Sequence, residues 1–214
     1  MIKRNSGNDL FAEFDGPIEL ELLKSGLSLI VGCDEAGRGP LAGPVVTAAV
    51  LFRNCDIMWK CKDSKSLTPE LRDYLYVEIV TCLEHAVVRI EPDIIDDINI
   101  RVASLNGMAQ AVTQLNCNAD IVLVDGRDRL PNLPHSRAIV KGDALVATIS
   151  AASIIAKVTR DRIMQEYHKV YPEYGFNRHF GYPTEMHRAV IKEIGPCPIH
   201  RRSFRGVREF VETH

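Results

Sequence analysis

Long apolar runs are absent from this 214-residue sequence, although 46% of its residues are hydrophobic. No run approaches the roughly 18 residues that indicate a transmembrane helix. The first residues, MIKRNSGND, also lack the apolar core of a signal peptide. We therefore expect a cytoplasmic protein with no membrane partner. The apolar fraction itself is ordinary for a globular protein and sufficient for a hydrophobic core.

Paired cysteines are also missing. The six cysteines form no C-x-x-C pair, so the spacings of zinc fingers and dithiol redox motifs do not occur. Cys197 and His200 have a C-x-x-H spacing, but no second pair accompanies them, and structural zinc is not expected. No Ser-His-Asp or Cys-His grouping indicates covalent catalysis. Internal repeats and low-complexity tracts are absent as well.

Net charge is small, at −2, but it is unevenly distributed. Residues 1–156 carry 15 basic and 21 acidic side chains, whereas residues 157–214 carry 11 basic and 7 acidic ones and five of the seven histidines. A basic end is the electrostatic footprint expected for contacts with nucleic-acid phosphates. An excess of +4 is modest, and it also suits a mixed solvated surface.

Acids and glycines are concentrated in one segment, Asp34-Glu-Ala-Gly-Arg-Gly39, directly after an apolar run. Acids before a glycine-rich turn commonly form only a solvated turn. Here a second buried-strand pattern follows at 45–52, so the acids would lie at the mouth of a strand–turn–strand unit. Neighbouring strand residues point to opposite faces, so Asp34 and Glu35 can share a metal only if the chain leaves the regular strand, which glycine permits. Arg38 suits a phosphate. The segment predicts a carboxylate-held cation beside a phosphodiester.

The hydrophobic pattern predicts an α/β chain with a mixed sheet, because three early strands are followed by alternating strands and helices. Strands are expected at 27–33, 45–52, 85–90, 121–124 and 138–140. Helices are expected at 8–23 with a break near Gly16-Pro17, then at 68–83, 93–97, 100–115, 146–167, 184–193 and 207–212. Thr68-Pro69 supplies an N-cap and a first-position proline. Residues 59–67 and 129–134 are expected to be loops.

Four acids are expected where the chain leaves a regular element: Asp34, Glu35, Asp125 and Asp143. Strand ends meet at one rim of an α/β sheet. Carboxylates so close together raise one another's pKa unless a cation lies among them. Ligation by oxygen atoms alone indicates Mg²⁺ or Mn²⁺ rather than zinc. Asp125 and Asp143 also suit an ordinary turn or helix-cap role. Four further acids are assigned to caps and surface: Asp63, Asp93, Asp96 and Asp97.

Several motifs occur in an order that resembles the type 2 ribonucleases H, the bacterial ribonuclease HII enzymes. They are Val31–Val45 (VGCDEAGRGPLAGPV), Asp63-Ser64-Lys65, Ile121–Gly126 (IVLVDG), Val140–Asp143 (VKGD), Ser150–Arg160 (SAASIIAKVTR), Gly181–Thr184 (GYPT) and Arg201–Phe204 (RRSF). The resemblance extends from about Leu27 to Arg205, nearly the whole chain. Together, these ordered motifs are far more specific than any one of them.

The resemblance implies a ribonuclease H-like mixed five-stranded sheet flanked by helices. It implies one domain over 1–214, with a core of about 27–170 and a small helical C-terminal extension of about 171–214. The family carries its catalytic acids at the four positions above, which implies hydrolysis with two Mg²⁺ or Mn²⁺ ions. The implied substrates are RNA–DNA hybrids and duplex DNA containing ribonucleotides, cut 5′ of the ribonucleotide to leave 3′-hydroxyl and 5′-phosphate ends. We expect a monomer.

Substrate choice requires a sensor for the 2′-hydroxyl, which alone separates RNA from DNA at such a site. The backbone of Gly37-Arg38-Gly39 can approach it closely, and Tyr182 matches the family's tyrosine that packs on the sugar at the RNA–DNA junction. Without the resemblance, a core or turn role would suit Tyr182 better. Expected phosphate contacts are Ser64, Lys65, Ser153, Lys157, Arg201, Arg202 and Ser203. Lys157 equally fits a helix surface.

Two positions depart from the family pattern. Ser66 and Phe180 stand where lysines are common, so phosphate affinity is expected to be lower, while the carboxylates are unaffected. Three other functions share part of this pattern. Another ribonuclease H-like nuclease or resolvase would share the metal centre but read a DNA junction, and a non-catalytic nucleic-acid binder would not need all four acids. A nucleotide phosphate loop needs G-x-x-x-x-G-K-[ST], but Pro44-Val45 follows the glycines here.

Overall fold

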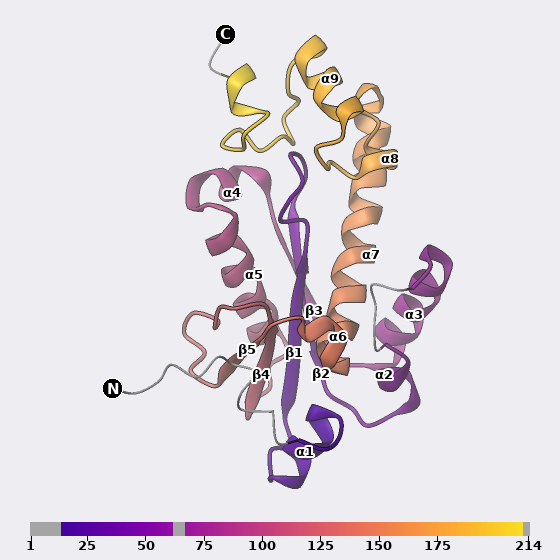
Figure 1. Ribbon diagram of the computed structural model, residues 1–214, viewed down its shortest axis with the longest axis vertical. Helices are drawn as coiled ribbons and strands as arrows, with labels where there is room; N and C mark the ends of the chain where they lie inside the picture. Colours follow the sequence, from indigo (N-terminus) through magenta and orange to yellow (C-terminus); the bar gives the residue numbers. More distant parts are fainter. Residues whose placement is uncertain (1–13, 62–66, 212–214) are drawn as a thin grey trace.

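A mixed five-stranded sheet forms the centre of the protein. The computed structural model describes residues 14–61 and 67–211. The strands are β1 (Ile30–Ala36), β2 (Val45–Leu51), β3 (His85–Ile90), β4 (Ile121–Asp125) and β5 (Ser136–Ile139). Their order is β3-β2-β1-β4-β5, with β1 antiparallel to β2 and parallel to β4 (Figure 1). The expected α/β class and mixed sheet are confirmed.

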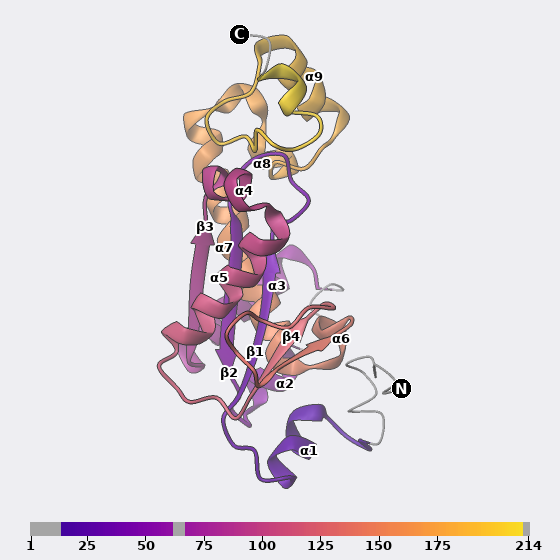
Figure 2. The ribbon, with the colours of Figure 1, turned by 90° about the vertical axis from the view of Figure 1, so that its left-hand side faces the viewer.

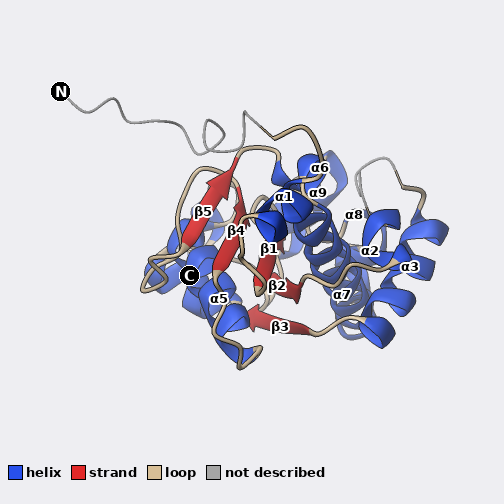
Figure 3. Cartoon of the chain, turned by 90° about the horizontal axis from the view of Figure 1, so that it is seen from below, coloured by secondary structure: helices blue, strands red, loops and turns tan. Residues whose placement is uncertain are grey.

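Helices cover both faces of this sheet. α5 (Ile100–Gln114), with α4 (Pro92–Ile98) before it, packs on one face, and α7 (Ala147–Val170) packs on the other (Figure 3). α2 (Asp56–Lys60) and α3 (Pro69–Cys82) lie against α7. Apolar side chains fill both layers, one cluster between the sheet and α7 and a second between the sheet and α5. The sheet is therefore buried on both faces, which explains its nearly continuous apolar strands.

The packing of α7 on β1 depends on a glycine. A Cβ atom at Gly32 would lie 2.5 Å from the backbone carbon of Thr148, so any side chain there would push the helix off the sheet. The first turn of α7 is also held by α1 (Ile18–Lys24), since buried Glu19 accepts hydrogen bonds of 2.9 Å from Thr148 N and Oγ1. A carboxylate at a helix N-terminus satisfies free amides and complements the helix dipole.

The C-terminal elements gather at one end of the sheet, beyond the loop that joins β1 to β2 (Figure 2). They are η3 (Pro172–Tyr174), α8 (Phe176–His179), α9 (Glu185–Ile194) and η4 (Arg208–Phe210). A third apolar cluster joins them to the rest of the chain. Its buried members are Leu41, Ala42, Met164, Tyr174, Phe176, Ile191, Ile199 and Val207. The β1–β2 loop is thus part of the core of the C-terminal region.

Most expected elements are present, with specific differences. Thr68 caps α3 as predicted, accepting from Leu71 N at 3.3 Å. The first strand was placed too early: β1 continues through Asp34 and Glu35 because its backbone still pairs with β2 there. Three short helices and a 3₁₀ turn were not anticipated: α2, α6 (Gly142–Leu145), α8 and η3. The last expected helix is only the 3₁₀ turn η4, and residues 8–13 of the first lie outside the described residues. No helix in 14–61 or 67–211 has the length and apolarity to cross a membrane.

Candidate active site

Asp34 and Glu35 lie inside β1 rather than beyond its end. Asp34 pairs with Ala48 and Glu35 with Thr47 across the antiparallel ladder, so the prediction that the chain leaves the strand at these acids is wrong. Strand geometry directs the two side chains toward opposite faces, but β1 ends at Ala36, and the Glu35 charge still raises the pKa of Asp34, so the two carboxylates remain within electrostatic range of each other. Asp34 is buried and interacts with the side chain of Ser153 on α7, one of the residues expected at the site.

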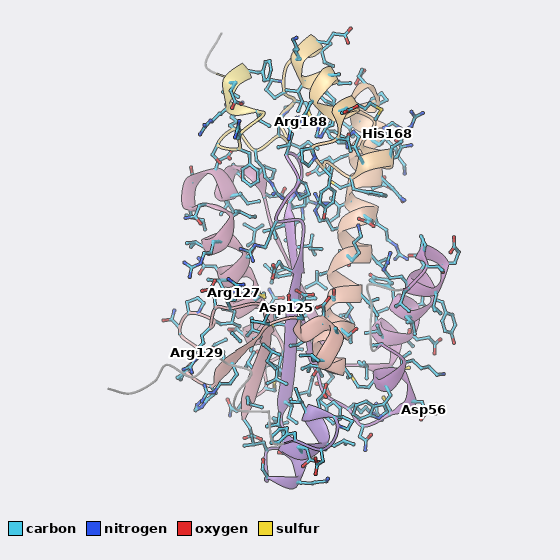
Figure 4. All side chains as sticks on the ribbon, viewed as in Figure 1. Asp56, Asp125, Arg127, Arg129, His168 and Arg188 are labelled. Atoms are coloured by element: carbon cyan, nitrogen blue, oxygen red, sulfur yellow. The ribbon has the colours of Figure 1, made fainter. Side chains whose placement is uncertain are left out.

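Asp125 is brought beside Asp34 by the parallel pairing of β1 and β4. Cys33 is opposite Val124, so one further step along both strands brings Asp34 level with Asp125. The Asp125 Oδ1 atom accepts a 2.7 Å hydrogen bond from Gly142 N at the start of α6. This contact places Asp143, the next residue and a buried one, close to the end of β4. Figure 4 shows Asp125 near the middle of the molecule, alongside β1.

The acids share one negative, poorly hydrated environment. Burial raises the pKa of Asp34 well above its usual value, and the charges of Glu35 and Asp125 raise it further, against hydrogen bonds from Ser153 and the Glu35 amide. Burial also raises the pKa of Glu35, opposed by Arg38, whose Nη1 lies 3.3 Å from Glu35 Oε1. Burial and the same three carboxylates raise the pKa of the Cys33 thiol. The repulsion from these carboxylates, which is the second cause after burial for Cys33 and Asp34, is the part that a bound cation would relieve.

The donor atoms fit a hard divalent cation, although the side chains do not form a complete ligand cage. Within the described residues, no three His, Cys, Asp or Glu side chains are grouped closely enough to hold a metal by themselves. Mg²⁺ is commonly held by one or two carboxylates together with water and substrate phosphates, so a preformed cage is not required. The carboxylate chemistry, the burial and the mutual repulsion all suit such an ion.

Two buried arginines hold the loop that follows the acids. Arg160 on α7 donates to the carbonyls of Ala42, Pro44 and Phe180 at 3.0–3.1 Å. Arg201 donates to the carbonyls of Gly37, Arg38 and Gly43 at 2.6–3.1 Å. Burial lowers their pKa values to about 10 and about 9, so both remain charged at neutral pH.

Gly37 is required at its position by this arrangement. Its φ of +102° lies in the region that favours glycine, and a Cβ atom there would lie 2.1 Å from Arg160 Nε. The conformation of the Gly-Arg-Gly segment therefore depends on side chains from distant parts of the sequence.

Tyr182 stands across a pocket from this segment. A Cβ atom at Gly39 would lie 3.7 Å from the Tyr182 ring, which is 42% exposed. The pocket, of about 390 Å³, is lined by Glu35, Ala36, Gly37, Arg38, Gly39, Arg72, Ser153, Ile154, Lys157 and Tyr182. Glu35, one of the four acids expected to hold metal, therefore shares a cavity with residues expected to read the ribose and to position phosphates.

The expected phosphate contacts fall into different places. Lys157 borders the pocket, forms a 2.7 Å ion pair with Asp161, and lies over the ring of Phe180. Arg202 is exposed. Ser203 hydrogen-bonds Asp96 on α4 through both its amide and its hydroxyl. Ser64 and Lys65, like Ser66, lie outside the described residues.

Arg201 requires a correction. Its side chain is fully buried and its guanidinium is committed to the backbone carbonyls described above, so it does not suit the predicted phosphate contact. Residues that the sequence reasoning missed include Arg72, which lines the pocket, and Arg160. Arg160 lies four residues from Ala156 and Met164 on the buried face of α7, a spacing that could have revealed its burial. Asp96 was assigned to the surface, and nothing in its local sequence indicates that it holds residues 202 and 203.

The chain is similar to several known proteins. The sequence profile of the family described as Ribonuclease HII matches residues 31–207. A ribonuclease HII of Chlorobium phaeobacteroides is 53% identical over 187 residues, covering 84% of this chain and 91% of the relative. One from Agrobacterium fabrum is 46% identical over 215 residues, covering 97% and 99%. The crystal structure of ribonuclease H2 from Pyrococcus horikoshii superposes with a TM-score of 0.72 at 30% identity, covering 86% of this chain and 97% of that one.

Proposed function

The chain belongs to the ribonuclease HII family and is an endoribonuclease that hydrolyses RNA in RNA–DNA hybrids. We propose that its catalytic centre is formed by the four acidic side chains on β1, β4 and α6. The residues proposed to act there are Asp34, Glu35, Asp125 and Asp143. One observation carries the proposal: Glu35 lines the same pocket as Gly37, Gly39 and Tyr182, so the acids adjoin the groups proposed to read the ribose.

We propose that these acids hold divalent cations, with Mg²⁺ or Mn²⁺ as the ions used. Bound there, such ions would lower the pKa of a water and stabilise the departing oxygen. The protein contributes the anionic donor set and keeps water from screening it, because Asp34 and Asp143 are buried. Arg38 is ion-paired to Glu35 and half exposed, so it can exchange that partner for a substrate phosphate.

Cleavage is proposed to fall 5′ of a ribonucleotide, leaving 3′-hydroxyl and 5′-phosphate ends, both within hybrids and at single ribonucleotides embedded in duplex DNA. The backbone of Gly37 and Gly39 is proposed to meet the 2′-hydroxyl, and the exposed ring of Tyr182 the neighbouring sugar. Ser153 and Lys157, which line the pocket, are proposed to contact phosphates, as is exposed Arg202 outside it. These contacts would position the duplex, whereas the 2′-hydroxyl would specify the site.

We propose that the chain acts as one ribonuclease H type 2 domain over 1–214, and as a monomer. The core of about 27–170 supplies the acids, and the extension of about 171–214 supplies Tyr182 and Arg202. The cytoplasmic location remains a prediction from the sequence.

Cleavage assays on four duplexes test the proposal: all DNA, DNA with one ribonucleotide, DNA with four, and a full hybrid, each with Mg²⁺ or Mn²⁺. We expect no cut in the first, one cut 5′ of the single ribonucleotide, and loss of all cleavage with EDTA. Rejoining of the products by a ligase that requires a 3′-hydroxyl and a 5′-phosphate identifies the two ends. Cleavage of the all-DNA duplex would instead indicate a DNA nuclease. Cleavage of the hybrid alone would refute the proposed cleavage at single ribonucleotides embedded in DNA.

A further inference from the structure

Three histidines of the C-terminal region form a buried group behind Tyr182. His179, His187 and His200 are each less than 7% exposed. The His179 and His187 rings stack with their centroids 4.3 Å apart, and His187 Nε2 lies 3.0 Å from His200 Nε2. None of the three is near the carboxylates, and the proposed function uses none of them. Two of the rings nevertheless form hydrogen bonds with the backbone of Gly181 and Tyr182.

The hydrogen-bond partners fix which ring nitrogen carries the proton in each histidine. His187 Nδ1 lies 2.9 Å from the carbonyl oxygen of Tyr182, which can only accept, so Nδ1 must carry the proton. In a neutral ring, Nε2 of His187 is then a bare acceptor, and His200 Nε2 must donate to it. His200 Nδ1 is then also bare and accepts from the Cys197 amide at 3.0 Å and from the Cys197 thiol, whose Sγ lies 3.1 Å away. The Cys197 carbonyl oxygen, 3.2 Å from the same nitrogen, accepts instead from the His200 amide at 3.0 Å. The chain of donors runs in one direction, from Cys197 through His200 and His187 to Tyr182.

His179 holds the preceding residue in the same way. Its Nε2 lies 2.7 Å from the carbonyl of Tyr174 and must donate, which leaves Nδ1 to accept the Gly181 amide at 3.2 Å. The backbone amide of Tyr182 donates to the carbonyl of His179 at 2.8 Å. Gly181 has a φ of +81°, so this turn is not a conformation that the chain adopts by default.

Neutral rings are consistent with the surroundings. Burial lowers the pKa of His187 to about 4 and that of His200 to about 3, with neighbouring histidines adding to the shift. Phe176 makes T-shaped contacts with the rings of both His179 and His187, and its helix α8 contains no acidic residue. The rings thus act as uncharged donors and acceptors of fixed orientation.

We propose that His179 and His187 are positioning residues that set the direction of the Tyr182 ring toward the ribose, with His200 fixing the tautomer of His187. The two rings hydrogen-bond the backbone of consecutive residues: His179 accepts from the Gly181 amide, and His187 donates to the Tyr182 carbonyl. The ring of Tyr182 is 42% exposed, faces Gly39, and has its centroid 5.9 Å from the Arg160 guanidinium carbon, so its direction depends on its backbone together with these two neighbours. This inference rests on the proposed contact between Tyr182 and the substrate.

A matched set of variants separates this role from a merely structural one. His187→Leu removes the donor to Tyr182, whereas His187→Asn places an amide donor near the position of Nδ1 and retains it. Ile191→Val, one turn further along α9 and fully buried, is the packing control. We expect His187→Leu to lower kcat for a single embedded ribonucleotide by roughly tenfold, with KM changed less, and His187→Asn to restore most of it. Ile191→Val should lower stability without changing this kcat.

Combination with Tyr182→Ala gives the deciding measurement. If His187 acts through Tyr182, the loss caused by His187→Leu should shrink to about twofold or less in the Tyr182→Ala background. Full additivity would overturn the positioning role while leaving the proposed function of Tyr182 intact. If Tyr182→Ala alone cleaves at the parent rate, the proposed ribose contact fails, and the inference fails with it.

Nitrogen NMR of the parent protein provides a test that does not depend on activity or on the folding of a variant. With ¹⁵N-labelled histidine at neutral pH, His187 should show the Nδ1–H tautomer, and His179 and His200 the Nε2–H tautomer. An Nε2–H tautomer at His187 would remove the hydrogen bond to the Tyr182 carbonyl and overturn the proposal.

Discussion

The Nη2 atom of Arg201 donates to the backbone carbonyl of Gly37 across 2.6 Å, although 164 positions separate these residues in the sequence. The same guanidinium also satisfies the carbonyls of Arg38 and Gly43. A side chain from the C-terminal region thus shapes the segment that is proposed to read the 2′-hydroxyl.

Arg201→Ala should destabilise the protein, because it removes the donor to two buried carbonyls, of Gly37 and Gly43, and to the partly buried carbonyl of Arg38. Each buried unsatisfied group costs about 1–3 kcal/mol, so a loss of roughly 2 kcal/mol or more in the free energy of unfolding is expected. Urea unfolding measures it. Arg201→Lys should recover only part of the loss, because one ammonium cannot reproduce the planar fork. A loss below about 0.5 kcal/mol, the scale of ordinary surface substitutions, would contradict this role.

Arg202→Ala should have the opposite profile, since Arg202 is exposed. Stability should change by no more than about 0.5 kcal/mol. Binding to all duplexes should weaken alike, and the slope of log affinity against log salt should fall by roughly 0.9 if one phosphate contact is lost. Titrations at several salt concentrations measure this slope. An unchanged slope would place Arg202 on an ordinary solvated surface.

Asp34→Asn should abolish cleavage while leaving duplex binding nearly intact. Loss of a charged ligand beside Asp125 removes a cation position, and a loss of about 4 kcal/mol in transition-state stabilisation corresponds to roughly a thousandfold in rate. Asp120→Asn is the control, because Asp120 lies just before β4, at its opposite end from Asp125, and accepts amides of residues 28 and 29. Cleavage by Asp34→Asn within tenfold of the parent would remove Asp34 from the site. The same assay applies to the other three acids.

Tyr182→Ala should slow cleavage at a single ribonucleotide by one to two orders of magnitude. A stacked ring contributes about 1–3 kcal/mol by analogy with base–aromatic stacking, and roughly 1.4 kcal/mol corresponds to tenfold in rate. Tyr182→Phe should be milder, since the ring remains. Metal affinity, measured by activity against Mn²⁺ concentration, should not change in either variant. An unchanged rate for Tyr182→Ala would leave the Gly37–Gly39 segment as the sole proposed reader of the ribose.

Acid should destabilise the protein through the buried histidines. A histidine whose pKa falls from 6.5 to about 4 on folding, as for His187, is protonated only in the unfolded chain between these values. Stability from this group is present above pH 6.5 and is lost as the pH falls toward 4, by about 2 kcal/mol at pH 5. Comparing urea unfolding of the parent and His187→Asn at pH 5 and pH 7.5 isolates this contribution, because the carboxylates are common to both. Equal pH dependence in the two proteins would refute it.

The sequence predicted the sheet better than it predicted the surroundings of the proposed catalytic acids. Buried strands such as β2 and β4 are apolar runs, and the Thr68 cap is a local signal. The extension of β1 through Asp34 and Glu35 has no local signal, because it is set by pairing with β2. Polar residues inside a strand look like the start of a loop when only the chain itself is considered.

Arg201 illustrates a second limit. A run of two arginines in a basic segment favours a surface that binds phosphates, yet one member is buried and the other exposed. The distinction depends on which carbonyls of the β1–β2 loop lack partners, and this is decided only when the C-terminal region packs on the loop. The histidines were missed for the same reason, since their partners are backbone atoms of a turn.

The dependence of the β1–β2 loop on Arg160 and Arg201 imposes an order on biosynthesis. The acids on β1 and β4 leave the ribosome early, whereas the donors that fix the loop are synthesised later. Because chains are made from the N-terminus at a limited rate, a nascent chain that has passed Asp143 but not reached residue 201 already carries the four acids but lacks the Arg201 side chain that holds the Gly37 carbonyl. The segment proposed to read the ribose therefore takes its final form after the proposed metal-binding acids have been synthesised.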